Sequence, residues 1–393
     1  MNDVDIAVVG AGLVGTPLAH ELSKQGWSVA LLDANPPRQT AQQEQPAFEA
    51  RMQERCTAIS LGTQQWFAKH GFWHGIEPDA CAIKQVHVSH KGYFGSTRLN
   101  ASELDAEAVG YVISNAHLGQ FFLEELHSSD VHHVPDARVN DVTYVDDHVQ
   151  INHAQGTVNA KLLIAADGVS SLVRDCAGIQ TRQIDYEQVA ILGTVQLTQP
   201  HHNIAYERFT ASGPLALLPR PDACMSFVDC INSEERELVE SLSDEHYLQR
   251  LQKRFGYRLG AFAAVGPRLA TPLIRIEACA QTAPRTVLLG NAVRLLHPVG
   301  GQGYNLAMRD VAQLLKCLST AFGNDVGSQA LLDDFTTARL RDQQTVVRFT
   351  DVLARGFRGN ASLPAHVRAL GLISLDTVSP LRKRFARQTM GLA

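Results

Sequence analysis

The chain has 393 residues, and its 35 basic and 40 acidic side chains give a formal charge of −5. Hydrophobic residues make up 45% and charged residues 19%, which excludes a disordered chain and a basic nucleic-acid-binding protein. The length allows two or three domains, or one catalytic body with insertions. The charge is uneven, because residues 339–393 carry ten basic and three acidic side chains, a net +7.

No apolar run approaches the roughly 18 residues of a membrane-spanning helix. The first residues are acidic, so we expect no secretory leader and a cytoplasmic protein. The seven cysteines show no CxxC spacing, and we expect free, mostly buried thiols and no metal site. HExxH, P-loop and GxSxG patterns are also missing from the sequence, which excludes the large enzyme classes that depend on them.

The N-terminal segment predicts a dinucleotide-binding βαβ unit. A buried strand at residues 5–9 runs into the glycine loop 10–15, a helix follows and stops at Gly26, and a second strand at residues 28–32 ends at Asp33. A glycine-rich loop between a parallel strand and a helix brings backbone N–H groups to a pyrophosphate. The alternative is an ordinary tight loop, but the complete strand–helix–strand context favours the dinucleotide.

Each position of this GxGxxG loop has a separate task. Gly10 makes the tight turn, Gly12 lets the backbone approach the pyrophosphate beside Leu13, and Gly15 lets the helix meet the strand. Asp33 is placed to bind a ribose hydroxyl. The loop alone does not separate NAD from FAD. Since no second GxGxxG occurs in the sequence, we expect one resident dinucleotide.

Two further strand–turn–helix segments follow. The strand 162–166 ends at Asp167-Gly168, and Ser170 or Ser171 can cap the next helix, although an ordinary turn is the simpler interpretation. A third strand, 287–289, leads to glycines 300, 301 and 303, which precede a helix with apolar residues at 311, 314, 315 and 318. A helix that opens on glycine amides offers a positive end to an anionic ligand.

These three segments, in this order, resemble the flavin-dependent aromatic hydroxylases of the para-hydroxybenzoate hydroxylase type, and more narrowly the ubiquinone-biosynthesis hydroxylases. The resemblance covers nearly the whole chain, including segments 86–89, 186–188, 207–210 and 213–219. It implies an α/β fold with a FAD-binding Rossmann domain of the GR2 type, an inserted mixed β-sheet substrate domain and a C-terminal helical segment. The implied boundaries are 1–75, 113–185 and 275–345 for FAD binding, 76–112 and 186–274 for the substrate domain, and 346–393 for the helical segment.

The resemblance also implies roles for individual residues. The implied FAD-binding residues are Gly10, Gly12, Leu13, Gly15, Asp33, Arg55 with Asn115 or Gln120, Asp167, Gly168, Asn291, Gly301, Gln302, Gly303 and Asn305, with Pro298 over the substrate side of the flavin ring. Asn291 stands where most of the wider family has Asp, and Arg294 where it has His or Asn. A neutral amide bonds a ribityl hydroxyl about half as strongly as a carboxylate does, and we hypothesise that Asn291 holds the ribityl chain.

The implied chemistry is carried by the cofactor. NAD(P)H transiently reduces FAD, O₂ forms a flavin C4a hydroperoxide, and one oxygen atom passes to the ring of a prenylated phenol. The expected reaction converts 2-polyprenyl-6-methoxyphenol to 2-polyprenyl-6-methoxy-1,4-benzoquinol. Another ring position in the same pathway, or a reductase or dehydrogenase of the same fold that inserts no oxygen, is the alternative. No catalytic side chain is assigned, because only Pro298 and Gly301 are expected near the flavin ring.

Two features leave alternatives open. Phe209, Leu215 and Leu217 are candidates for the substrate pocket or for ordinary sheet core. In the basic tail, Leu381, Phe385 and Leu392 alternate with basic residues. This pattern suits an anionic membrane surface at the inner membrane face, but a helical cap or a contact with a partner in a ubiquinone-biosynthesis complex fits it as well.

Overall fold

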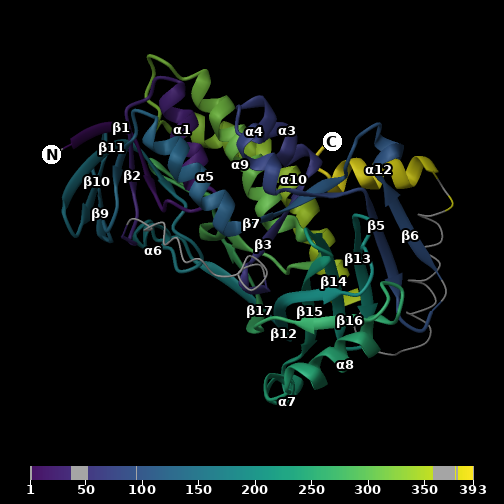
Figure 1. The fold of residues 1–393 in the computed structure, drawn as a ribbon. Coiled ribbons are helices and arrows are strands. Elements are labelled where there is room, and N and C mark those ends of the chain that lie inside the picture. Colours follow the sequence, from purple (N-terminus) through teal and green to yellow (C-terminus); the bar gives the residue numbers. More distant parts are fainter. Residues whose placement is uncertain (1, 37–51, 94, 357–376, 378, 393) are drawn as a thin grey trace.

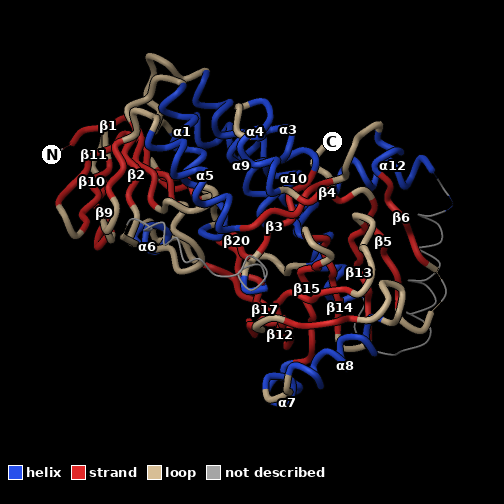
Figure 2. Tube along the Cα trace, viewed as in Figure 1, coloured by secondary structure: helices blue, strands red, loops and turns tan. Residues whose placement is uncertain are grey.

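The computed structural model describes residues 2–36, 52–93, 95–356, 377 and 379–392. Two large sheets lie in different parts of the molecule, and long helices pass between them (Figures 1 and 2). The first sheet carries the predicted strand–loop–helix segments, and the second lies at the other end beside α7 and α8. None of the described helices is long and apolar enough to cross a membrane.

The first sheet has eight strands with a parallel centre in the order β19-β11-β1-β2-β8. Its strands are β1 (Asn2–Val9), β2 (Val29–Leu32), β8 (His132–Val134), β9 (Val139–Tyr144), β10 (Val149–His153), β11 (Gly156–Ala165), β18 (Thr282–Ala283) and β19 (Thr286–Leu288). All three sequence segments predicted as strands before ligand-binding turns therefore lie side by side as β1, β11 and β19. Their carboxyl ends, where α/β folds bind ligands, meet at one edge.

Both faces of this sheet are covered, as its nearly continuous apolar strands predict. Ile6 and Val8 of β1 pack into a core with helices, whereas Ala7 and Val9 point to the opposite core beneath β9 and β10. The helices of this region are α1 (Gly15–Lys24), α3 (Leu61–Lys69), α4 (Trp73–Ile76), α5 (Asn115–His127), α6 (Leu172–Cys176) and α9 (Gln302–Ser319).

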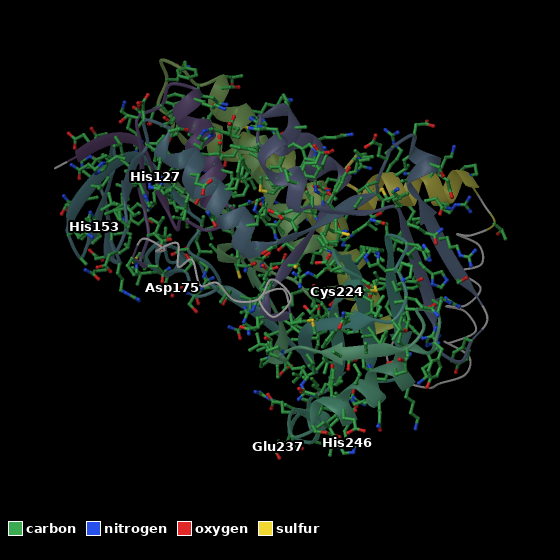
Figure 3. All side chains as sticks on the ribbon, viewed as in Figure 1. His127, His153, Asp175, Cys224, Glu237 and His246 are labelled. Atoms are coloured by element: carbon green, nitrogen blue, oxygen red, sulfur yellow. The ribbon has the colours of Figure 1, made fainter. Side chains whose placement is uncertain are left out.

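The second sheet has nine strands and is mixed, because β5 and β13 pair in parallel while the other pairs are antiparallel. Its strands are β5 (Gln85–His90), β6 (Ser96–Asn100), β12 (Thr181–Leu197), β13 (Ile204–Thr210), β14 (Gly213–Arg220), β15 (Cys224–Asn232), β16 (Phe262–Val265), β17 (Leu269–Ala278) and β20 (Arg294–Leu295). One face packs against α7 (Arg236–Glu240) and α8 (Asp244–Phe255). Glu237 and His246 on these helices lie at the outer end of the molecule (Figure 3).

Smaller elements connect the two sheets. A three-stranded sheet joins β3 (Cys56–Ser60), β7 (Gly110–Ser114) and β4 (Cys81–Ile83), and α10 (Gln329–Gly356) and α12 (Ser379–Thr389) follow at the end of the chain. Short 3₁₀ helices lie at η1 (Glu77–Asp79), η2 (Ala101–Leu104), η3 (Ser233–Glu235), η4 (Gly290–Ala292) and η5 (Val299–Gly301). The α/β class and the mixed second sheet are confirmed, whereas the exact domain boundaries stay a prediction.

All seven cysteines are free thiols, as expected. Burial is less complete than expected, because only Cys81, Cys224 and Cys230 are buried and Cys279 is exposed.

Candidate active site

The loop between β1 and α1 is shaped by its three glycines. Gly10 has a φ of +106°, and a Cβ there would lie 2.4 Å from the carbonyl oxygen of Ala166 at the end of β11. A Cβ on Gly15 would lie 2.0 Å from the carbonyl oxygen of Gly10, whereas one on Gly12 would meet nothing within 4 Å. Gly10 and Gly15 therefore permit close packing within the protein, and Gly12 leaves an open space in front of the loop.

Asp33 lies beside this loop at the end of β2. Its Oδ2 accepts a hydrogen bond of 2.6 Å from the backbone N–H of Ala11, and its Oδ1 accepts from the backbone N–H and side-chain amide of Asn35 at 2.7 and 2.9 Å. The hydroxyl of Tyr304 on α9 donates to the carbonyl of Leu13 at 3.0 Å. These bonds fix the glycine loop between the acidic end of β2 and the helix of the third motif.

The turn at Asp167-Gly168 lies directly against Gly10, whose Cβ would come 3.0 Å from the backbone nitrogen of Asp167. Oδ2 of Asp167 accepts from the backbone N–H of Val173 at 3.3 Å, but Oδ1 is buried and has no hydrogen-bond partner. Burial raises the pKa of Asp167. A buried carboxylate oxygen without a donor is costly, and a ligand hydroxyl at this site would satisfy it.

The third motif adds a loop on the other side of the same site. Gly290 follows β19 and has a φ of +58°. A Cβ at this position would lie 3.4 Å from the Cγ2 atom of Val14 in the first loop. Asn291 beside it is exposed, so its amide is available to a ligand. Gly300 and Gly301 both have positive φ, near +70° and +60°, and Gly303 opens α9 with nothing within 4 Å of a built Cβ.

Asn305 holds the second glycine loop in place. Its Oδ1 accepts from the backbone N–H of Ser60 at 2.7 Å and from the Thr63 hydroxyl at 2.8 Å, and its Nδ2 donates to the carbonyls of Ala58 and Gly301 at 3.0 and 2.8 Å. Four bonds use the capacity of this amide within the protein. Its side chain therefore braces the loop against β3. Gln302 acts similarly, donating to the carbonyls of Gly300 and Thr389.

The remaining predicted cofactor residues lie directly before β3 and on α5. Arg55 is exposed, and its carbonyl accepts from the backbone N–H of Asn115 at 2.9 Å. Asn115 also accepts from Thr57 at 2.6 Å. Gln120 is exposed, and its amide donates at 2.9 Å to Glu124, one turn along α5. Of the two candidate polar residues at the start of this helix, the structure places Asn115 next to Arg55.

Arg294 lies in a buried charge cluster. Its guanidinium donates to Asp310 at 3.3 Å and to Gln343 at 2.9 Å, and Asp310 also accepts from Arg339 at 2.6 Å. The cluster joins β20, α9 and α10. Arg294 therefore ties the helix that follows the glycine loop to α10.

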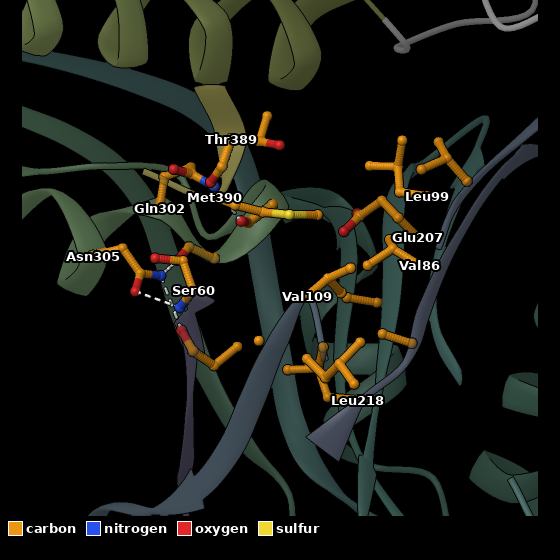
Figure 4. A pocket seen from close by; sticks show the side chains of 18 of the residues that line it. Ser60, Val86, Leu99, Val109, Glu207, Leu218, Gln302, Asn305, Thr389 and Met390 are labelled. Atoms are coloured by element: carbon orange, nitrogen blue, oxygen red, sulfur yellow. Dashed lines mark hydrogen bonds between the residues drawn. The ribbon is translucent and has the colours of Figure 1, made fainter. Parts of the chain in front are cut away.

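An apolar cavity of about 450 Å³ opens from the second glycine loop toward the large mixed sheet (Figure 4). Its wall comes from β3, β4, β5, β6, β7, β13, β14, β15, the loop at η5, and helices α9, α10 and α12. The lining includes Ile59, Ile83, Val86, Val88, Leu99, Val109, Ala205, Glu207, Phe209, Ala216, Leu218, Val228, Pro298, Gly300, Gly301, Phe349, Leu353, Phe385 and Met390. Pro298 and Gly301 thus stand where the cofactor loops meet the cavity.

The structure separates the three candidate pocket residues. Phe209 lines the cavity, but Leu215 and Leu217 lie in the core between the sheet and α8. Side chains alternate along a strand, so Ala216 and Leu218 of β14 face the cavity instead. Of the two roles that the sequence leaves open, ordinary sheet core holds for Leu215 and Leu217, and the pocket role holds for Phe209.

Three residues of the cavity wall are not predicted from the sequence. Glu207 is one of them, although an acidic residue between Ala205 and Phe209 on one face of a strand is a signal that period-2 alternation can find. Phe385 of α12 and Met390, directly after this helix, are the others. Phe385, Met390 and Leu392 of the basic tail therefore pack inward against the catalytic body.

The residues present fit a bound FAD. The open face of Gly12, the carboxylate at the end of β2, the unpartnered Asp167 oxygen and the glycine-led start of α9 form one continuous group around the carboxyl ends of β1, β11 and β19. A pyrophosphate has backbone donors there, and a planar ring at Gly301 would border the cavity.

Comparison with known proteins agrees with this geometry. The family model of the FAD binding domain matches residues 3–350, and the chain belongs to this family of FAD-dependent aromatic hydroxylases. It is 33% identical to the ubiquinone hydroxylase UbiL of Rhodospirillum rubrum, over 98% of this chain and 89% of the relative. It is 27% identical to the 3-demethoxyubiquinol 3-hydroxylase of Escherichia coli, over 99% and 98%. The fold matches Pseudomonas aeruginosa PqsL with a TM-score of 0.78 at 19% identity, covering 95% of this chain and 100% of PqsL.

Proposed function

We propose that this protein is a FAD-dependent monooxygenase that hydroxylates the aromatic ring of a prenylated phenol in ubiquinone biosynthesis. The cavity carries the proposal, because its wall is almost entirely apolar and it begins at Pro298 and Gly301, beside the loops that fit FAD. A prenylated ring needs such a wall, and reactive oxygen at a flavin needs the same exclusion of water. The names of the similar ubiquinone hydroxylases support it.

The substrate we propose is 2-polyprenyl-6-methoxyphenol, and the product is 2-polyprenyl-6-methoxy-1,4-benzoquinol. The relatives include enzymes that their names assign to other steps of ring hydroxylation. Hydroxylation at another ring position is therefore the alternative, and the position of the new hydroxyl group in the product decides between them.

We propose that the cofactor is held by Gly10, Gly12, Leu13, Gly15, Asp33, Arg55, Asp167, Gly168, Asn291, Gly301 and Gly303. Gln302 and Asn305 hold the loop that carries Gly301 and Gly303, and Gln120 has the weakest support because it bonds along its own helix. FAD, reduced by NAD(P)H, supplies the activated oxygen. The protein orients the phenol and keeps water out. If Asn291 binds the ribityl chain, Asn291→Ala lowers FAD occupancy in dilute protein, and full occupancy would contradict that role.

Isotope labelling tests the reaction. The FAD-loaded full chain is incubated with NAD(P)H, ¹⁸O₂ and a short-chain 2-prenyl-6-methoxyphenol, and we expect one labelled oxygen atom in the ring product. A reductase or dehydrogenase of the same fold would consume NAD(P)H without placing label in the product. Gly12→Val serves as the control that lacks bound flavin.

We also propose that the protein meets its bilayer-resident substrate as a cytoplasmic, peripheral membrane protein. Lys383, Arg384 and Arg387 of α12 are exposed, whereas Phe385 faces inward. Contact through these cations is electrostatic and salt-sensitive. Their alternative partner is another protein of a ubiquinone-biosynthesis complex.

A further inference from the structure

Glu207 is unusual among the residues that line the cavity. Of the described residues in that wall, it is the only one with an acidic or basic side chain. It lies on β13 between Ala205 and Phe209, with its carboxyl group directed into the cavity (Figure 4). Burying an ionisable group in an apolar wall costs free energy. We therefore look for the role of Glu207 in its contact with the ligand of the cavity.

The hydrogen bonding of this carboxyl group is incomplete. The backbone N–H of Gly300, in the loop that leads to α9, is near enough to lower the pKa of this carboxyl group. Its Oε1 is buried and has no hydrogen-bond partner. The terminal torsion of Glu is soft and roughly two-fold, so either oxygen can turn toward a ligand. A ligand hydroxyl group would supply the missing donor.

The surroundings of Glu207 explain its proton affinity. Burial raises the pKa of Glu207 to about 7, and the Gly300 N–H limits this rise. Its neighbours on the adjacent strands are Ala216 of β14 and Val88 of β5. The helices opposite present Phe349, Leu353, Phe385 and Met390 to the cavity. The titratable groups nearby are the buried thiol of Cys230 on β15 and the Tyr206 hydroxyl, whose pKa values are both raised by burial.

We propose, on the basis of the function proposed above, that Glu207 binds the ring hydroxyl of the phenol substrate and accepts its proton during hydroxylation. The carboxylate lies beside Gly300, and Gly300 is two residues from Pro298 in the same loop. A phenol bonded to the carboxylate therefore lies at the cofactor end of the cavity. A hydroxyl donor is the chemical class that this carboxylate recognises. The methyl ether of the same ring has no O–H to donate and is not recognised.

The proton transfer balances as follows. As the ring carbon bonds to the oxygen atom delivered by the cofactor chemistry, the phenol O–H bond breaks and its electron pair forms a ring carbonyl. The proton passes to the Glu207 carboxylate. When the hydrogen on the hydroxylated carbon leaves to water, the ring becomes aromatic again and the carboxylic acid returns its proton to the ring oxygen. Glu207 ends as it began.

The first test measures binding without turnover. FAD-loaded full-length protein is titrated with 2-prenyl-6-methoxyphenol and with its O-methyl ether, and flavin fluorescence or absorbance reports binding. We expect the phenol to bind about tenfold or more tightly than the ether above pH 7, because hydrogen bonds to charged groups are strong. The affinity for the phenol should rise as the pH passes through about 7, since the carboxylate form accumulates, while that for the ether should not.

The matched variants are Glu207→Gln, which keeps the shape but cannot take a proton, and Glu237→Gln, which changes an exposed residue at the far end of the molecule. In Glu207→Gln the preference for the phenol should shrink and its dependence on pH should disappear. Its kcat should fall about 10²- to 10⁴-fold, as for loss of a general base. Glu237→Gln should match the wild type in all three.

The outcomes separate the two proposals. If the wild type binds the phenol and the ether equally at every pH, or Glu207→Gln hydroxylates at the wild-type rate, the role of Glu207 is wrong and the proposed function stands. If the wild type shows the pH-dependent preference but yields no labelled product, the proposed function fails. Unchanged binding of the ether by Glu207→Gln verifies an intact cavity. Should that variant not fold, the wild-type comparison of phenol and ether still decides.

Discussion

A carboxyl group on an apolar wall affects stability as well as chemistry. The pKa of Glu207 is raised to about 7 from an ordinary value of 4.5, so the folded state binds the proton more tightly than the unfolded state. The contribution of Glu207 to the free energy of unfolding is therefore highest below pH 4.5, falls as the pH rises, and levels off above pH 7. The total cost is about 3 kcal/mol.

This predicts an unusual pH dependence for one variant. Glu207→Gln has no carboxyl group to desolvate, so its Tm relative to the wild type should increase between pH 5 and pH 8, in protein without phenol. Thermal unfolding followed by circular dichroism measures it, with Glu237→Gln as the exposed control. A constant difference in Tm across this range would contradict the burial of an ionisable group.

The glycines of the first loop predict two different failures. A side chain at Gly12 meets no protein atom within 4 Å, whereas one at Gly15 would overlap the carbonyl of Gly10. Gly12→Val should therefore fold normally but lose FAD, and Gly15→Val should lose about 1–3 kcal/mol of stability as well. Flavin absorbance and thermal unfolding separate these effects. A yellow, FAD-loaded Gly12→Val protein would contradict the assignment of the loop.

At the scale of elements, the buried cluster around Asp310 joins the cofactor helix α9 to the cavity helix α10. Asp310→Asn should lose about 3–5 kcal/mol, because the buried charge of Arg294 loses its carboxylate partner and Arg339 keeps only its pair with Asp342. Urea unfolding measures the loss, and exposed Asp334→Asn on α10 is the control. Equal midpoints for the two variants would show that the cluster contributes little.

The elements also show what a single sequence can and cannot predict. The three glycine-bearing turns were predictable because each rests on a local pattern, and β1, β11 and β19 bring them together as expected for a parallel sheet. The sequence did not show which residues of β14 face the cavity, since both faces of this strand carry apolar side chains. The sequence favours the sheet core for Phe209, Leu215 and Leu217 alike, and α8 covers the side of Leu215 and Leu217 whereas Phe209 lines the cavity.

Contacts with distant parts of the chain determine where the side chains of the basic tail lie. Charge and hydrophobicity along residues 381–392 suit a membrane contact, although a cap on the catalytic body or a contact with a protein partner is the favoured interpretation of this sequence. Long-range packing settles the apolar part, since Phe385 contacts the Phe349 ring and Arg382 pairs with Glu103 at 2.7 Å. The position of these partners, far away in sequence, could not be read from the tail.

The exposed cations of α12 give a prediction at this scale. Replacing Lys383, Arg384 and Arg387 together by Glu should weaken binding to anionic vesicles by about a hundredfold, at about 1 kcal/mol for each basic residue. Co-sedimentation with phosphatidylserine vesicles at low and high salt measures it. The control variant carries Lys69→Glu, Arg182→Glu and Lys253→Glu on other faces. Equal sedimentation of both variants would assign the cations to a protein partner.

Because α12 closes the cavity, the cavity wall is completed late in the synthesis of the chain. The residues of α12 follow every other part of the wall in the sequence, so a ribosome makes them after the three glycine loops and both sheets. The nascent chain can therefore complete its dinucleotide site while the substrate chamber still lacks Phe385 and Met390. The start of β1 lies at the other side of the molecule from α12, so the strand that is made first is far from the helix that completes the cavity (Figure 1).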